Sequence, residues 1–146
     1  MMESELLIAN IVLMIAEKVG IVRKRVFGIF TLELREDGIL HRHVSENGEY
    51  RVGAIRDLNS VIGEMVNHRP VPVLITSDDF VVYPSETSSY RANKSSSPYS
   101  KAEAVIARTP AHQLMTAFYL KANPPQRPTK MFENEEDAVD WLKTFL

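Results

Sequence analysis

The chain has no cysteine among its 146 residues, and this absence removes several kinds of chemistry at once. Disulfides, thiolate metal sites and cysteine nucleophiles are all excluded. No glycine-rich phosphate loop with its lysine is present, and nothing in the chain predicts a cofactor. The net charge of −2 comes without a basic stripe interleaved with aromatics, so nucleic acid is not an expected partner. The lack of cysteine is compatible with the cytoplasm, where we expect the protein.

The chain also lacks an apolar run long enough to cross a bilayer, which takes about 20 residues. The run at residues 6–16 follows two glutamates and precedes no small-residue cleavage site, so it is not typical of a signal peptide. We expect residues 1–27 to form an extension, helical from about Glu3 to Lys18, that packs on its own domain or forms a homodimer contact. Association with a membrane surface is the less favoured alternative. Met14 is a second candidate for the first residue.

The clearest pattern lies at the C-terminal end. A short strand is predicted at residues 130–132, followed by a helix with Asn134 as N-cap and Asp137 at its third position. Acidic residues fill the first turn, where the helix dipole favours negative charge. Apolar residues at helical spacing then predict a buried face formed by Ala138, Trp141, Leu142 and Phe145.

Similar patterns predict the elements that come before this end. Alternating strand formers at residues 29–35 and 39–44 flank a hairpin turn at residues 36–38. A helical apolar stripe follows over residues 52–66. The continuous apolar run at residues 71–76 is typical of a strand that is buried on both faces.

The second half of the chain continues the alternation of helices and strands. A short helix is predicted from about Pro84, since proline suits a first helical turn, and a strand at residues 102–107. Residues 28–146 therefore form one α/β domain with a sheet of about five strands, an opening hairpin followed by parallel strands, and four helices. One of these helices runs from Pro110 to Lys121, and its predicted inward residues are Leu114, Met115, Phe118 and Tyr119.

This order resembles the STAS domain, the fold of bacterial anti-sigma-factor antagonists of the SpoIIAA-like group, with Sec14-like lipid carriers as distant relatives. The resemblance rests on the opening hairpin, the strand Val71–Thr76 and the ending Pro128-Thr-Lys-Met-Phe through Asp140-Trp-Leu142, which is similar to the close of bacterial STAS-like proteins. It implies a regulatory module that is not an enzyme and that binds a protein partner.

In antagonist-type members, a serine in an Asp-Ser-Ser-Gly loop after the central strand is phosphorylated by the partner kinase. The resemblance places Ser85 at this position, with Pro84 where the aspartate stands and Thr87 where the glycine stands. A phosphate there would lie at a helix N-terminus, which stabilises anions. The alternative is that Ser85 only caps the helix.

The expected docking surface is the loop–helix region 77–92, because aromatics and arginine are favoured at interfaces. Its residues are Asp78, Asp79, Tyr83, Ser85, Ser88, Tyr90 and Arg91.

Two other functions compete with docking. A small-molecule or lipid-binding domain would need an apolar cavity of about 300 Å³ or more between sheet and helices. A small enzyme would use Asp78 and Asp79, which follow a predicted parallel strand, and a histidine within hydrogen-bond reach would favour it. His41 and His43 share one face of a strand, but we expect a solvent-facing polar side there and no metal, because no third ligand is evident.

Overall fold

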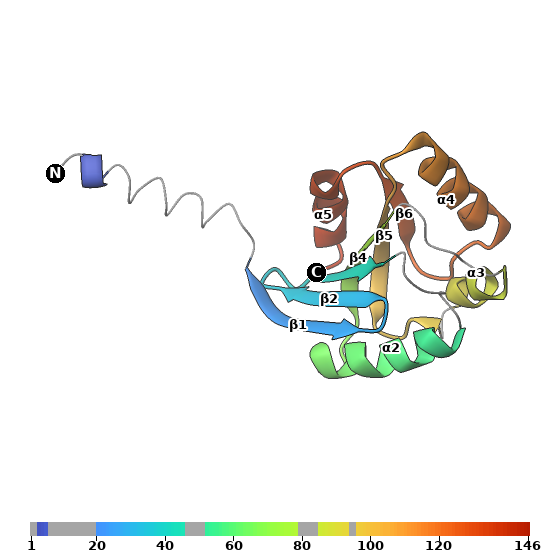
Figure 1. Cartoon of the computed structure of the whole chain (residues 1–146), viewed down its shortest axis with the longest axis horizontal. Coiled ribbons are helices and arrows are strands. Elements are labelled where there is room, and N and C mark those ends of the chain that lie inside the picture. Colours follow the sequence, from blue (N-terminus) through green and yellow to red (C-terminus); the bar gives the residue numbers. More distant parts are fainter. Residues whose placement is uncertain (1–2, 6–19, 46–51, 79–84, 94–95) are drawn as a thin grey trace.

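The computed structural model describes residues 3–5, 20–45, 52–78, 85–93 and 96–146. A single six-stranded mixed sheet forms its centre, with helices on both faces (Figure 1). The strands are β1 (Ile21–Phe27), β2 (Phe30–Arg35), β3 (Leu40–Val44), β4 (Val71–Ser77), β5 (Ser100–Ile106) and β6 (Thr129–Phe132). The helices that follow the start of the sheet are α2 (Val52–Met65), α3 (Ser85–Ala92), α4 (Pro110–Ala122) and α5 (Glu135–Lys143).

The strands lie in the sheet in the order in which they occur in the chain. β1, β2 and β3 form an antiparallel meander, and β3 to β6 are parallel neighbours. Gly28 and Gly38 make the two tight turns of the meander with φ of +57° and +87°, a conformation that glycine adopts without steric cost. This topology confirms the predicted α/β fold with an opening hairpin and parallel strands.

The strand order decides where the helices lie. Right-handed crossovers that all step in one direction bring α2, α3 and α4 to the same face of the sheet. The opposite face is covered by α5, which contacts β4, β5 and β6. One face of the four parallel strands is therefore shared by three helices, while the other receives one.

Two hydrophobic cores follow from this layering. The α2 core lies between α2 and the first five strands, and the α5 core lies between α5 and the strands that it covers. The buried residues of the α2 core are Phe30, Leu32, Leu40, Val44, Ile55, Leu58, Ile62, Met65, Val66, Val73 and Ile75. Those of the α5 core are Ile39, Leu74, Ala102, Ala104, Ile106, Ala138 and Leu142.

The sheet begins earlier than the sequence pattern indicated, so it has six strands and not about five. β1 lies within residues 1–27, and its side chains are largely exposed. Three adjacent basic residues interrupt the apolar alternation there, and charged residues are usual on an edge strand. Arg23 donates to the carbonyl oxygen of Met65 at 3.0 Å, and Lys24 lies 3.6 Å from Glu33. Residues 3–5 are helical, but most of the predicted helix and its homodimer contact lie outside the described residues.

The remaining elements are confirmed with bounds that shift by at most two residues. The Asn134 side chain accepts from the backbone N–H of Asp137 at 2.9 Å, as the capping pattern predicted. Ala138 and Leu142 of α5 are fully buried. None of the helices in the described ranges is long and apolar enough to cross a membrane.

The predicted inward face of α4 is wrong for three of its four residues, whereas Tyr119 is half-buried and lines a pocket. Leu114, Met115 and Phe118 are 74%, 50% and 66% exposed, and α4 has no buried residue. The cause is the shared face, because side chains of α2 already fill its centre. α4 is left at the rim with most of its apolar side chains in solvent.

Candidate functional site

Polar side chains of β3 and β4 form a hydrogen-bonded relay at the carboxyl ends of these parallel strands. Thr76 Oγ1 lies 2.7 Å from His41 Nε2 and 2.7 Å from His43 Nδ1. His43 Nε2 lies 2.9 Å from Asp78 Oδ1. His43 and Thr76 are register partners in the parallel pair, which explains why residues more than thirty positions apart meet. We call these four residues the histidine relay.

When both imidazole rings are neutral, each ring has one N–H donor and one acceptor nitrogen, so the donors in the relay can be arranged in only one way. The ionised carboxylate of Asp78 only accepts, so His43 Nε2–H donates to it. His43 Nδ1 must then accept from the Thr76 hydroxyl, and that hydroxyl accepts from His41 Nε2–H. The lone pair of His41 Nδ1 is left at the far end of the relay.

The electrostatics of His41 agree with a neutral ring at that position. Burial lowers the pKa of His41 below its ordinary value, the charges of Glu135 and Glu33 oppose this shift, and those of His43 and Arg35 add to it. His41 is therefore neutral at pH 7, as the relay requires.

The relay satisfies the distance condition for nucleophile, base and orienting carboxylate. The nucleophile position is held by Thr76, which is only 8% exposed and whose hydroxyl is already hydrogen-bonded to both imidazole rings. Within the described ranges, no group of three side chains is placed to hold a metal ion. The histidines of β3 are therefore only partly exposed and are held by specific partners, where a solvent-facing polar side was expected.

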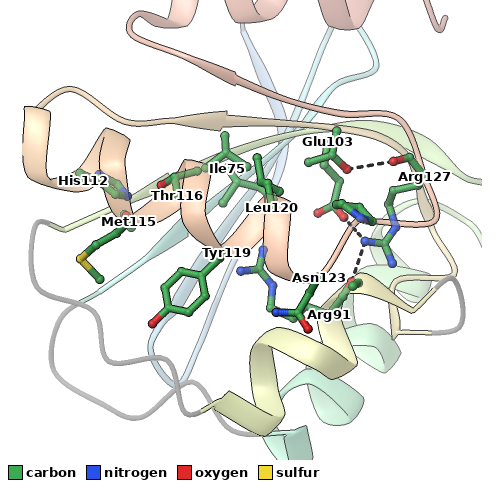
Figure 2. A pocket seen from close by; sticks show the side chains of 15 residues that line it. Ile75, Arg91, Glu103, His112, Met115, Thr116, Tyr119, Leu120, Asn123 and Arg127 are labelled. Carbon is green, nitrogen blue, oxygen red and sulfur yellow. Dashed lines mark hydrogen bonds and ion pairs between the residues drawn. The ribbon is translucent and has the colours of Figure 1, made fainter.

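A pocket of about 100 Å³ lies on the opposite face, between α3, α4 and strands β4 to β6. Figure 2 shows His112 and Met115 at one end of this pocket and Glu103 and Arg127 at the other, while Arg91 extends toward α4 from α3. Its volume is well below the roughly 300 Å³ at which sites for drug-sized ligands begin.

A buried ion triad lies at one end of this pocket, where two of its members, Glu103 and Arg127, line the space. Glu103 Oε1 lies 2.6 Å from Arg127 Nη1, and Glu103 Oε2 lies 3.4 Å from Arg42 Nη2. All three side chains are buried, so the triad combines two guanidinium groups with one carboxylate in a region of low dielectric.

Arg127 also ties the triad to α3. Its Nη1 donates to the carbonyl oxygen of Arg91 at 2.9 Å, and its Nη2 donates to that of Asn93 at 2.6 Å. Nη2 further donates to Ser96 Oγ at 3.0 Å. The C-terminal end of α3 is thereby fastened to β5 through one side chain.

Three of the predicted docking residues can be placed with their side chains. Asp78 belongs to the histidine relay. Tyr90 packs against the α2 core, and the guanidinium carbon of Arg56 lies 5.9 Å from its ring centroid. Arg91 lines the pocket on the other face. These residues of region 77–92 therefore do not form a single patch.

The side chains of the other four predicted docking residues lie outside the described part of the structure. Ser85 is the first residue of α3 and Ser88 lies within it, but their side chains lie outside the described part of the chain. Asp79 and Tyr83 also fall outside the described residues. Phosphorylation and capping at Ser85 both remain predictions.

The sequence analysis missed the triad, although one signal for it was present. Glu103 is the only charged residue in the otherwise apolar run at residues 102–107, and Arg42 stands between two histidines. A charged residue in a buried strand needs a partner of opposite charge. The pattern indicates such a need, but it does not say which arginine meets it.

The fold and its sites define a small α/β protein in which an opening hairpin precedes a parallel sheet, with a buried ion triad on one face and a histidine relay on the other. The chain belongs to the family described as a domain of unknown function (DUF7793), which matches residues 32–146.

Two solved structures are similar to this chain. One is an uncharacterized protein of the DUF3478 family with a SpoIIAA-like fold from Shewanella loihica PV-4, at 15% identity and a TM-score of 0.42, covering 86% of this chain and 92% of the other. The second is a protein with unknown function from Arthrobacter sp. FB24, at 18% identity and a TM-score of 0.25, covering 81% and 96%. These values support no conclusion about function. No curated protein matches the chain.

Proposed function

We propose that the chain is a non-enzymatic, regulatory protein-interaction module that docks through α3 and α4. The observation that carries this proposal is the exposure of Leu114, Met115 and Phe118 on one helix. Methionine and aromatic side chains are enriched at protein interfaces, and adjacent exposed apolar side chains mark such sites. We call these three residues, together with the neighbouring α3, the α3–α4 surface.

The proposed α3–α4 surface extends the predicted docking region 77–92 to α4 and has its apolar centre on that helix. The N-terminal end of α4 is held by its cap, where Thr109 accepts from the N–H of His112 at 3.1 Å. The residues on its pocket side hold the rest of the helix against the sheet. Its outward apolar side chains contribute little to folding while they stay in water. A partner that covers these side chains would remove their apolar surface from water and so stabilise the complex.

Phosphorylation of Ser85 is proposed as the regulatory step. A phosphate would add about two negative charges to the first turn of α3, at one border of this surface. Ser85→Ala should leave partner binding intact, and Ser85→Asp should weaken it. Equal binding of the two variants would contradict regulation by phosphorylation of Ser85, but it would not contradict docking through the α3–α4 surface.

The docking proposal is tested by affinity capture from the native host with a matched pair of variants. Leu114→Ser combined with Phe118→Ser removes the apolar centre of the α3–α4 surface. Val22→Ser combined with Val26→Ser removes two equally exposed apolar side chains from β1. Wild type and the β1 variant should retain one stoichiometric partner, and the α4 variant should lose it. A partner retained by the α4 variant would contradict the proposal.

A second candidate function is acid–base catalysis, because the structure brings Asp78 within 2.9 Å of a histidine. This contact supplies one part of what the enzyme alternative required, whereas Asp79 lies outside the described residues. Hydrolysis of p-nitrophenyl acetate by wild type and by His43→Gln is a direct test. A rate that the variant lowers at least tenfold would favour catalysis, and equal rates would count against it. The lipid-carrier alternative gains no support from the pocket between α3 and α4, which is too small for a lipid as far as the described residues define it.

A further inference from the structure

The pocket and the α3–α4 surface meet at Met115. This side chain is half exposed, and it also lines the pocket. Around the helix axis, Met115 lies between the outward pair, Leu114 and Phe118, and the pocket-lining Tyr119. A partner that covers the outward pair and extends around Met115 therefore reaches the space between α3 and α4 (Figure 2).

The charged end of this space has one positive charge in excess. Arg42 and Arg127 share the single carboxylate of Glu103, and both oxygens of that carboxylate are already engaged. Glu103 and Arg127 line the space, whereas Arg42 does not, and the Nε atom of Arg127 is buried without a hydrogen-bond partner among the described residues. Buried charge without an opposite partner is unfavourable, so an entering anion would be stabilised here.

The volume limits the size of that anion. A space of about 100 Å³ is about a third of the roughly 300 Å³ at which sites for drug-sized ligands begin. One carboxylate with its methylene groups fits this volume, whereas a nucleotide or a lipid does not. The hydroxyl and amide groups of Thr116 and Asn123 line the same space and supply further hydrogen-bond donors.

We propose that the pocket receives one aspartate or glutamate side chain of the docking partner, and that apolar side chains of the same segment cover Leu114 and Phe118. The inference rests on the proposed function and specifies its partner as an acidic, amphipathic segment. The carboxylate forms charge-assisted hydrogen bonds beside Arg127, and the apolar contacts supply buried area.

A displayed library of helical peptides, panned against the full chain, tests this partner chemistry. Peptides whose binding is lost with Leu114→Ser and Phe118→Ser report on the α3–α4 surface. The inference expects these peptides to share one acidic residue beside their apolar anchors. Peptides that use this surface without a common acidic residue would overturn the inference and leave the docking function in place. A selection without any peptide for this surface would overturn both.

The best selected peptide then allows a charge-specific measurement. Replacing its acidic residue with the matching amide should weaken binding to wild type about tenfold, the usual scale for one charge-assisted hydrogen bond. Equal affinity of the acid and amide peptides overturns the inference. This comparison changes only the peptide, so it stays valid if a protein variant fails to fold.

Variants of the triad give the reciprocal result. Glu103→Gln keeps the side-chain shape and raises the excess positive charge, so the acidic peptide should bind about tenfold more tightly. Arg42→Met removes the excess charge and should weaken binding of the acidic peptide but not of the amide peptide. Arg56→Gln, outside the pocket, is the matched control and should leave both affinities unchanged. An acidic peptide that responds equally to the Arg42 and Arg56 variants would contradict the assignment of its carboxylate to the triad.

Discussion

Helices α4 and α5 have similar sequence patterns, but only α5 buries its apolar side chains. Each begins at a side-chain cap, Thr109 for α4 and Asn134 for α5. Each carries a lysine in its last turn and apolar residues at three- and four-residue spacing. Nevertheless, α5 buries Ala138 and Leu142 completely, whereas α4 buries none of its residues.

The difference shows what an apolar stripe on a helix specifies. The stripe indicates that a helix gains stability from a covering surface, but it does not say which molecule provides that surface. α5 has one face of the parallel strands to itself. α4 shares the other face with α2 and α3, and an ion triad, in place of an apolar core, occupies the sheet end of its pocket. We infer that the fold uses α5 for stability and leaves α4 available for binding.

The largest effect is expected from breaking the triad on the α4 side. Glu103→Ala leaves Arg42 and Arg127 buried without an anion, which should lower the free energy of unfolding by about 4 kcal/mol. Urea denaturation measures this loss. Glu103→Gln, which keeps an oxygen for the arginines, should cost less. A loss below about 1 kcal/mol for the alanine variant would mean that the triad does not hold this side of the sheet together.

The next effect separates the two helices directly. Leu142→Ala removes a fully buried side chain of α5 and should cost about 3 kcal/mol in urea denaturation. Leu114→Ala, the same substitution at an exposed position of α4, should change stability by less than about 0.5 kcal/mol. Similar losses for both variants would show that α4 is covered in solution.

The caps should behave alike, because they are local features. Asn134→Ala and Thr109→Ala each remove one side-chain acceptor for a helix N–H and should each cost about 1 kcal/mol. Thermal melts of the two variants test this symmetry. A cost at only one of the helices would mean that burial, and not the cap, decides how firmly each helix end is held.

The smallest effect is expected from pH, on the α5 side of the sheet. Burial lowers the pKa of His41, so the unfolded chain binds more protons than the folded one below the ordinary histidine value of about 6.5. The His41 contribution to stability is therefore complete above that pH and is lost as the pH falls through the folded pKa. Melting temperature against pH should show this slope in wild type, and His41→Gln should flatten it. An unchanged slope in the variant would assign the pH dependence to other groups.

Local patterns in the sequence determined the identity of most elements and the ends of several. The hairpin at Gly38, the cap at Asn134 and the buried stripe of α5 all follow from interactions between residues close in the chain. Such interactions depend on spacing alone, and spacing is visible in a sequence. β1 was missed because three basic residues hide its alternation, although an exposed edge strand tolerates them.

Only the tertiary structure decided which distant residues meet. The two triad contacts join residues 61 and 24 positions apart, and the relay joins β3 to β4 across 33 to 35 positions. These contacts depend on strand register and on the order of strands in the sheet, which local spacing does not encode. The same strand order sends three helices to one face, so it also leaves the apolar side of α4 in solvent while α5 is buried.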